Sequence, residues 1–193
     1  MVLAWGLAVV FGMCSLVRYQ MTPAALAQGV PAQWPEGLSF SRNTTRSTLV
    51  MTLHPECPCS RASLSELAQI LSRSEGRLDA RVLFVHLANA PANWLNSDLW
   101  RQAKAIPNAI VMLDEGGRDT AAFGAITSGQ VMVYDASGAM RFSGGITDGR
   151  GHEGDNAGLF AILSLVRDGK SQVSTTPVYG CSLGISKAKS ISR

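Results

Sequence analysis

The chain has 193 residues, of which 46% are hydrophobic and 16% are charged, and its formal net charge is +3. This composition predicts one compact domain with an apolar appendage. The charge is mild, and no run of Lys and Arg is interleaved with aromatic residues, so the sequence argues against a nucleic-acid-binding protein. Lys187, Lys189 and Arg193 give residues 185–193 only a weakly basic character, and we treat them as a tail.

The first residues form an apolar run. No charged side chain occurs in residues 1–17, and Arg18 ends the run. This length lies between the roughly 20 residues of a membrane span and the shorter core of a signal peptide. We therefore expect residues 1–19 to be a membrane anchor or a signal segment. We favour an uncleaved anchor, because the small-residue triplet at residues 25–27 lies well past the apolar run.

The next stretch, residues 20–47, has no sustained hydrophobic period. It contains Pro23, Pro31 and Pro35 among Gln, Ser and Thr residues. This composition is typical of a linker, so we expect a tether here and a folded domain over residues 48–184.

A strand, a turn and a helix follow, and they organise the rest of the chain. The apolar run at residues 49–53 predicts a strand buried on both faces, which is typical of a parallel sheet. Apolar residues then recur at helical spacing at Leu64, Leu67, Ala68 and Leu71. Cys57 and Cys59 lie at the turn between these two elements.

The position of the two cysteines predicts reactive sulfur. If Pro58 takes the first helical position, Cys57 is the N-cap and Cys59 lies in the first turn. The free N–H groups and the dipole of the helix then favour a thiolate and lower its pKa. His54 and Glu56 would tune the thiol in opposite directions, since a protonated imidazole favours a thiolate and a carboxylate disfavours it.

The Cys-Pro-Cys spacing is one residue shorter than the Cys-x-x-Cys of thioredoxin. Residues two apart on a helix point to nearly opposite sides, so a disulfide between Cys57 and Cys59 would be strained and therefore oxidising. Alternatively, each cysteine pairs with a substrate, with a partner protein, or with Cys181 near the C-terminus. The spacing leaves these pairings open.

The remaining pattern predicts the fold class. We expect strands at 80–87 and 109–114, a short helix or an irregular segment covering the sheet within 91–105, and a turn of helix at 120–123. A hairpin over 130–142 and a last helix that begins at Asp155-Asn156 and ends at Gly169 follow. Strand and helix alternate first, and a hairpin and a helix follow. This order predicts an α/β, thioredoxin-like fold: a mixed central sheet flanked by helices, preceded by the N-terminal transmembrane helix.

Five blocks of sequence resemble the RedB-type redoxins, a bacterial branch of the thioredoxin superfamily. The blocks are residues 54–63, 123–130, 144–147, 150–156 and 180–183, and the resemblance covers about residues 34–184. It implies a redoxin domain held at the inner membrane by a single span and facing the periplasm. The chain departs from the superfamily in two ways: the usual cis-proline would fall near residues 127–129, where there is no proline, and the Cys-x-x-Cys is replaced. The missing proline argues against ordinary thioredoxin-style substrate docking, and the replaced motif argues against general disulfide reductase activity.

A glycine-punctuated loop carries Arg150 and His152 just before the last helix. Such a loop can bind an anion at the helix N-terminus, or its glycines can simply permit tight turns. The sequence leaves open whether His152 tunes a thiol.

Three functions fit these residues. The first is thiol–disulfide exchange with protein thiols or disulfides and with a membrane electron donor, in which Cys57 attacks and Cys59 or Cys181 resolves, without a cofactor. The second is a Cu(I) or Zn(II) site built from Cys57 and Cys59 with His54 or His152. The third is a peroxiredoxin-like peroxidase with Cys57 as the attacking thiolate.

Overall fold

The computed structural model describes residues 1–25, 29–87 and 97–185. Its helices are α1 (Val2–Gln20), α2 (Ser60–Arg73), α3 (Asp98–Lys104), α4 (Arg118–Ala122) and α5 (Ala157–Asp168). Its strands are β1 (Ser47–Leu53), β2 (Leu78–His86), β3 (Ala109–Glu115), β4 (Gln130–Tyr134) and β5 (Met140–Gly144). Trp94 and Leu95, part of the predicted segment 91–105, lie outside the described residues.

The five strands form one mixed sheet in the order β3-β2-β1-β4-β5. β1 pairs in parallel with β2, and β2 pairs in parallel with β3. β4 runs antiparallel to both β1 and β5. The six residues of β1 from Thr48 to Leu53 are all buried, as predicted for a strand covered on both faces. The hairpin of β4 and β5 supplies the antiparallel half, so the predicted mixed sheet is confirmed.

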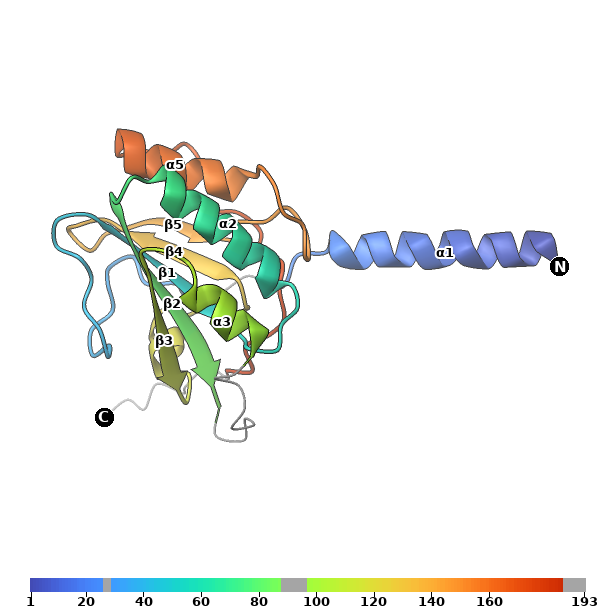
Figure 1. Ribbon diagram of the computed structural model, residues 1–193, viewed down its shortest axis with the longest axis horizontal. Coiled ribbons are helices and arrows are strands. Elements are labelled where there is room, and N and C mark those ends of the chain that lie inside the picture. The colour runs from blue at the N-terminus through green and yellow to red at the C-terminus, as the bar shows by residue number, and fades with distance from the viewer. Residues whose placement is uncertain (26–28, 88–96, 186–193) are drawn as a thin grey trace.

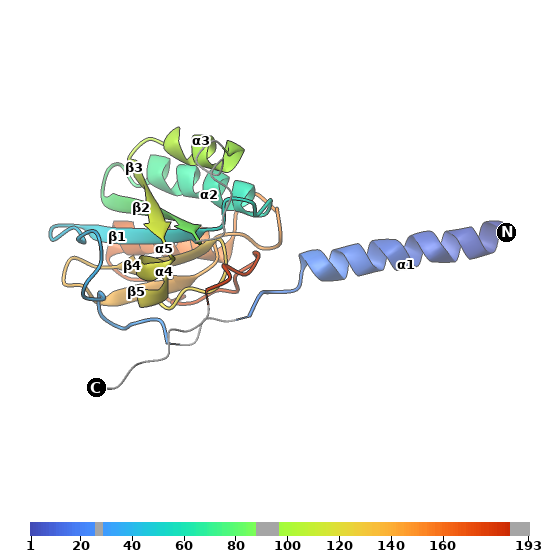
Figure 2. The same cartoon turned by 90° about the horizontal axis from the view of Figure 1, so that it is seen from below.

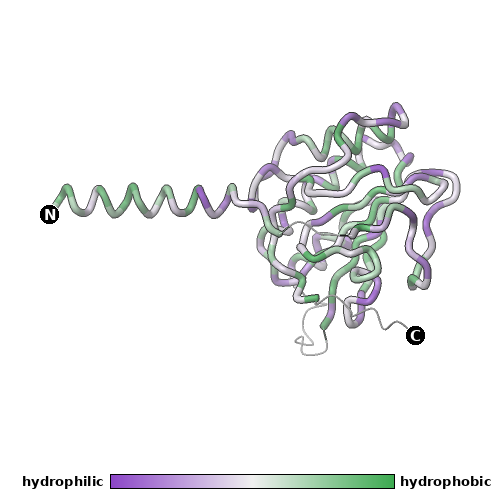
Figure 3. The backbone as a smooth tube through the Cα atoms, turned by 180° about the vertical axis from the view of Figure 1, so that it is seen from behind, coloured by the Kyte–Doolittle hydropathy of each residue, from purple (hydrophilic) through white to green (hydrophobic). Residues whose placement is uncertain are grey.

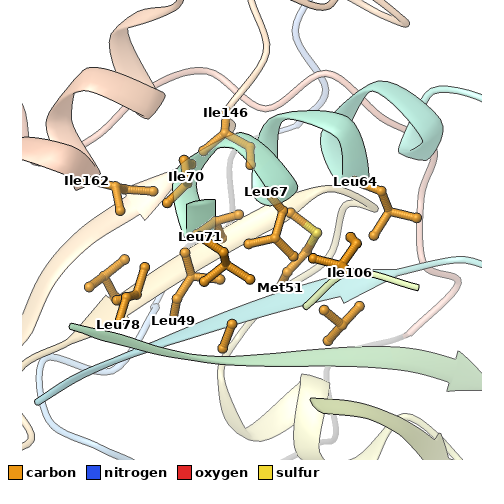
Figure 4. Close-up of a cluster of buried hydrophobic side chains, with 14 of the residues drawn as sticks. Leu49, Met51, Leu64, Leu67, Ile70, Leu71, Leu78, Ile106, Ile146 and Ile162 are labelled. Atoms are coloured by element: carbon orange, nitrogen blue, oxygen red, sulfur yellow. The ribbon is translucent and has the colours of Figure 1, made fainter. Parts of the chain in front are cut away.

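Helices α2, α3 and α5 cover one face of the sheet, and α4 lies on the other (Figures 1 and 2). In the larger core cluster, Leu64, Leu67 and Ile70 of α2 lie over Leu49 and Met51 of β1 (Figure 4). Burying each such side chain contributes about 1.5–3 kcal/mol. This packing fixes the start of α2 above the end of β1, where the cysteine turn lies.

The opposite face is covered partly by residues that the sequence placed in the tether. Trp34 packs edge-on against Phe123 and Tyr134, with ring centroids 5.2 and 5.3 Å apart. Its backbone N–H donates to the carbonyl of Gly138, and the N–H of Met140 donates to the carbonyl of Ala32. The packed domain therefore begins well before residue 48. The apolar residues responsible are too widely spaced to give a periodic signal.

The caps of α5 agree with the sequence. Asn156 is the N-cap, and its side chain accepts a hydrogen bond of 2.9 Å from the N–H of Leu159. Gly169 ends the helix in the left-handed conformation, which glycine adopts without steric cost. The start of α5 is thereby fixed beside the loop that contains Arg150.

Helix α1 projects away from the domain (Figure 1). Within the described residues it is the helix long and apolar enough to cross a membrane, and none of its residues is buried. Figure 3 shows hydrophobic residues along most of its length. Cys14 lies exposed on this helix, away from the domain. An N-terminal apolar helix is thus confirmed, and it fits either an anchor or a signal segment.

Candidate functional site

The turn between β1 and α2 holds Cys57 and Cys59, but helix α2 begins later than predicted. Helix α2 starts at Ser60 with Cys59 as its N-cap, so the expectation that Pro58 is the first helical residue and Cys57 the N-cap is wrong. Instead, the N–H of Ser60 donates to the carbonyl of Cys57 at 3.0 Å, and the N–H of Arg61 donates to that of Pro58 at 3.3 Å. These tight turns use the fixed φ of Pro58 before the α-helical pattern starts. Both sulfurs still lie at the amino end of the helix.

Cys181 reaches the same place from the far end of the chain. Residues 180–183, which we call the C-terminal strap, run antiparallel to residues 126–128, the loop that leads into β4. The N–H of Ser128 donates to the carbonyl of Cys181 at 2.8 Å, and the N–H of Leu183 donates to the carbonyl of Ile126 at 2.9 Å. Three free thiols, Cys57, Cys59 and Cys181, therefore form one cluster.

Cys57 is the most acidic member of this cluster. Burial by itself raises the pKa of Cys57, but hydrogen bonds from the Ser60 hydroxyl, from the Cys181 thiol and N–H, and from the N–H of Cys59 outweigh it. The net effect lowers the pKa below the usual value for a thiol. Hydrogen bonds to the charged form, rather than exposure, stabilise the thiolate. The residue itself is only 1% exposed.

A chain of hydroxyl groups orients the donor on Ser60. The Ser128 hydroxyl oxygen accepts a hydrogen bond of 2.8 Å from the backbone N–H of His54, so its own hydrogen is free to point elsewhere. Ser60 Oγ lies 2.8 Å from Ser128 Oγ. If Ser128 donates to Ser60, the Ser60 hydrogen is directed to the sulfur of Cys57. Both serines are buried, so the chain is shielded from water.

The other two thiols are weaker acids than Cys57. Burial raises the pKa of Cys59, and the negative charge of Cys57 raises it further, whereas a hydrogen bond from Arg150 opposes both. Burial, the hydrogen bond to Cys57 and the nearby sulfur charges raise the pKa of Cys181 to about 12, again opposed by Arg150. The cluster thus separates one more acidic thiol from two less acidic ones.

Arg150 links this cluster to the strap and to the end of α1. Its Nη1 donates to the carbonyl of Gly180 at 2.6 Å, and its guanidinium carbon lies 4.9 Å from the ring centroid of Tyr19. Its backbone N–H donates to the carbonyl of Gln20 at 3.0 Å. Its buried Nε has no hydrogen-bond partner in the part of the chain that the structure describes. The partly buried guanidinium is therefore held against the strap and the thiols.

Glu66 holds the loop that contains Arg150. Its side chain is fully buried in α2, and one carboxylate oxygen accepts a hydrogen bond of 2.7 Å from the N–H of Gly154. The other oxygen lies 3.5 Å from Nδ2 of Asn156. Burial raises the pKa of Glu66; the bond from Gly154 lowers it, and neighbouring carboxylates raise it again. Helix α2 thus holds the loop that contains Arg150 in place through Glu66.

Of the two histidines considered from the sequence, His152 is exposed and His54 is partly buried. His152 lies exposed in the turn after Arg150, with its N–H donating to the carbonyl of Gly149 at 3.3 Å. His54 accepts a hydrogen bond on Nδ1 from the N–H of Glu56. Burial lowers the pKa of His54, and the charge of Glu56 opposes this, so the imidazole is neutral at neutral pH. The positive charge that acts on the thiols comes from Arg150.

Among the described residues, no group of three or more His, Cys, Asp or Glu side chains is arranged to hold a metal ion. The set of Cys57 and Cys59 with His54 or His152 is therefore not assembled as ligands in this arrangement. Copper or zinc binding remains a sequence-based prediction.

Four residues of the site carried little or no sequence signal. Ser60 and Ser128 are common residue types at unremarkable positions, and Glu66 fits any amphipathic helix. Arg150 stands in a glycine-rich loop, which pointed to anion binding but not to thiols. Only the approach of four separate segments gives these side chains a shared role.

Comparisons with known proteins support the fold. No protein-family model and no curated protein matches this chain. An uncharacterized conserved protein from Geobacillus kaustophilus superposes with a TM-score of 0.64 at 14% identity, covering 87% of this chain and 99% of that one. A hypothetical protein from Sinorhizobium meliloti 1021 gives 0.63 at 16% identity, covering 84% and 97%. A thioredoxin-like protein solved in its oxidized form gives 0.53 at 12% identity, covering 75% and 100%. The chain therefore has the predicted thioredoxin-like fold, with a mixed sheet flanked by helices.

Proposed function

We propose that this chain is a thiol–disulfide oxidoreductase of the RedB type, anchored in the inner membrane by α1 with its domain in the periplasm. The observation that carries the proposal is the cluster of three thiols in which Cys57 alone has a lowered pKa. A thiolate attacks disulfides, and a protonated thiol close to it can complete the exchange. The periplasm is a compartment in which protein disulfides form and persist.

The first step joins Cys57 to a partner protein. The Cys57 thiolate attacks one sulfur of the partner's disulfide, and the partner's other sulfur leaves as a thiolate. A mixed disulfide forms between this chain and the partner, and the total number of disulfide bonds is unchanged. The proton that the leaving sulfur needs is available from the neighbouring thiol of Cys59.

The second step releases the partner as a dithiol. Cys181 loses a proton, attacks the sulfur of Cys57, and expels the second partner sulfur, which takes up a proton. This chain is then oxidised to a disulfide by two electrons, and a dithiol reductant at the membrane restores it. The ionisation of Cys181 becomes easier at this stage, because two of the causes that raise its pKa are the hydrogen bond to Cys57 and the negative charge of Cys57. Both are lost when Cys57 is in a disulfide, and Arg150 remains.

We favour Cys181 over Cys59 as the resolving residue. Cys181 contacts the sulfur of Cys57 through both its thiol and its N–H. Cys59 is two residues away along the chain, where a disulfide would distort the turn.

The test uses the full chain in detergent micelles, with insulin as the protein disulfide and dithiothreitol as the dithiol reductant. We expect Cys57→Ser to abolish catalysed insulin reduction and Cys181→Ser to accumulate the mixed disulfide. Cys14→Ser, in the exposed helix α1, serves as the matched control and should retain the parent rate. An undiminished rate in the Cys57→Ser protein would eliminate the proposed role.

A further inference from the structure

The attacking sulfur is covered in this structure. Cys57 is 1% exposed, although an incoming disulfide has to approach it in line. The Cys181 thiol and N–H contact its sulfur, so the C-terminal strap lies where the partner's sulfur has to arrive. Displacement of the strap would open an approach to this sulfur.

The strap is bound in the manner of an added β-strand. Two backbone hydrogen bonds hold it to residues 126–128, with Thr127 and Ser182 opposite each other in an antiparallel bridge. When an extended segment adds to exposed backbone in this way, main-chain hydrogen bonds give affinity, and pockets for alternate side chains give specificity. Any extended segment that replaced the strap would meet the same donors and acceptors.

Two positions of the strap show which side chains fit. A Cβ atom on Gly180 would lie 1.9 Å from the carbonyl oxygen of Ser128, so the residue before the cysteine has to be glycine. Two residues after the cysteine, Leu183 is fully buried among Val50, Phe123 and other residues of the smaller core cluster. Ser182, between them, is exposed, and its hydroxyl oxygen accepts a hydrogen bond of 3.2 Å from the N–H of Gly184.

We propose that residues 180–183 are a built-in occupant of a peptide-docking strip formed by residues 126–128, and that the partner displaces them with an extended segment of the pattern Gly-Cys-x-Leu. This inference rests on the proposed function, because the docked cysteine is the one that exchanges with Cys57. The strap and the partner compete for one place. Return of the strap then brings Cys181 to the mixed disulfide and removes the partner's backbone from the strip in the same movement.

The first test measures binding without redox chemistry. The probe is a fluorescent synthetic peptide with the sequence of residues 179–184 and serine in place of its cysteine, and the protein is the full chain carrying Cys14→Ser. We expect the chain truncated after Tyr179 to bind this peptide roughly tenfold or more tightly than the untruncated chain, as two net backbone hydrogen bonds and a buried leucine allow. A peptide with alanine in place of its glycine should lose that gain. Equal affinity of the two chains, or of the two peptides, would overturn the proposal.

A second variant guards against misfolding of the truncated chain. Gly180→Ala keeps every other residue but places a methyl group against the Ser128 carbonyl, so it should lift the strap and admit the peptide. Ser174→Ala, at an exposed position upstream in the same C-terminal segment, should behave as the parent does. Failure of the peptide to bind either the truncated chain or the Gly180→Ala chain counts against the docking strip.

The last measurement separates this inference from the proposed function. The cysteine-containing peptide, activated as a mixed disulfide with thionitrobenzoate, is offered to the same chains carrying Cys59→Ser. Cys57 attacks the peptide sulfur and thionitrobenzoate leaves as a coloured thiolate. Faster capture by the truncated chain supports the docking strip. If Cys57 exchanges with no disulfide while the serine peptide still binds, the proposed function fails and the docking strip stands.

Discussion

Removing the Ser60 hydroxyl should make Cys57 a weaker acid. A hydrogen bond to a charged group contributes about 1.5–3 kcal/mol, and one pKa unit corresponds to about 1.36 kcal/mol. Ser60 is one of several donors to the sulfur, and the bonds from Cys181 and from the N–H of Cys59 remain in its absence. We therefore take the lower end of the range and expect Ser60→Ala to raise the pKa of Cys57 by about one unit.

The rate of exchange should change less than the pKa. At a pH below the pKa, one unit reduces the thiolate fraction about tenfold, but the more basic sulfur is also the better nucleophile, so the net loss is about threefold. The assay is the pH dependence of iodoacetamide modification at Cys57, located by peptide mass mapping in the Cys14→Ser background. Ser65→Ala is the matched control, because Ser65 lies on the same helix and bonds to Glu153 instead. If Cys57 of the Ser60→Ala protein ionises at the same pH as in the parent, the reasoning about the hydroxyl chain is refuted.

Three further predictions concern charge, pH and packing. Arg150→Gln should raise the pKa of Cys59 and Cys181 and slow release of the partner about tenfold, and it should shift the pH profile of the resolving step to higher pH. Arg141→Gln, at an exposed position, is the control, and an unshifted profile in the Arg150→Gln protein would exclude an electrostatic role. Burial raises the pKa of Asp135, but hydrogen bonds from Ser137, Arg141 and Ala139 outweigh burial and lower this pKa from 3.8 to about 2. The ionised carboxylate therefore stabilises the folded protein fully above pH 3.8, and this stabilisation is lost as the pH falls through 2. Asp135→Asn should remove about 1–2 kcal/mol of unfolding free energy at neutral pH and less in acid; a loss independent of pH, by urea titration, would contradict this. Trp34→Ala should cost about 3 kcal/mol of unfolding free energy, whereas exposed Glu36→Ala in the same segment should cost almost nothing; a near-zero cost for both would mean that this segment is a free tether in solution.

Local sequence was sufficient for the elements that bring Cys57 and Cys59 to the end of the sheet. The all-apolar run of β1 and the helical period of α2 are short-range patterns, and each determines which faces of its element are buried. The same holds for the Asn156 cap, the Gly169 end and the hairpin turn, because each depends on the dihedral preferences or hydrogen bonds of a few adjacent residues. The N-terminal apolar helix belongs to this group as well.

Only the tertiary structure decided which groups act on the sulfur. Cys181, Arg150 and Ser128 are distant from Cys57 along the chain, and no periodic pattern records that their segments meet. The sequence left open whether His152 tunes a thiol, whereas the fold places the Arg150 guanidinium at the thiols and leaves His152 exposed. Burial of Cys57 under the strap was equally invisible, since it follows from two backbone hydrogen bonds and the absence of a Cβ atom on Gly180. A chain's local preferences fix its elements, but pKa and access depend on what those elements bring together in space.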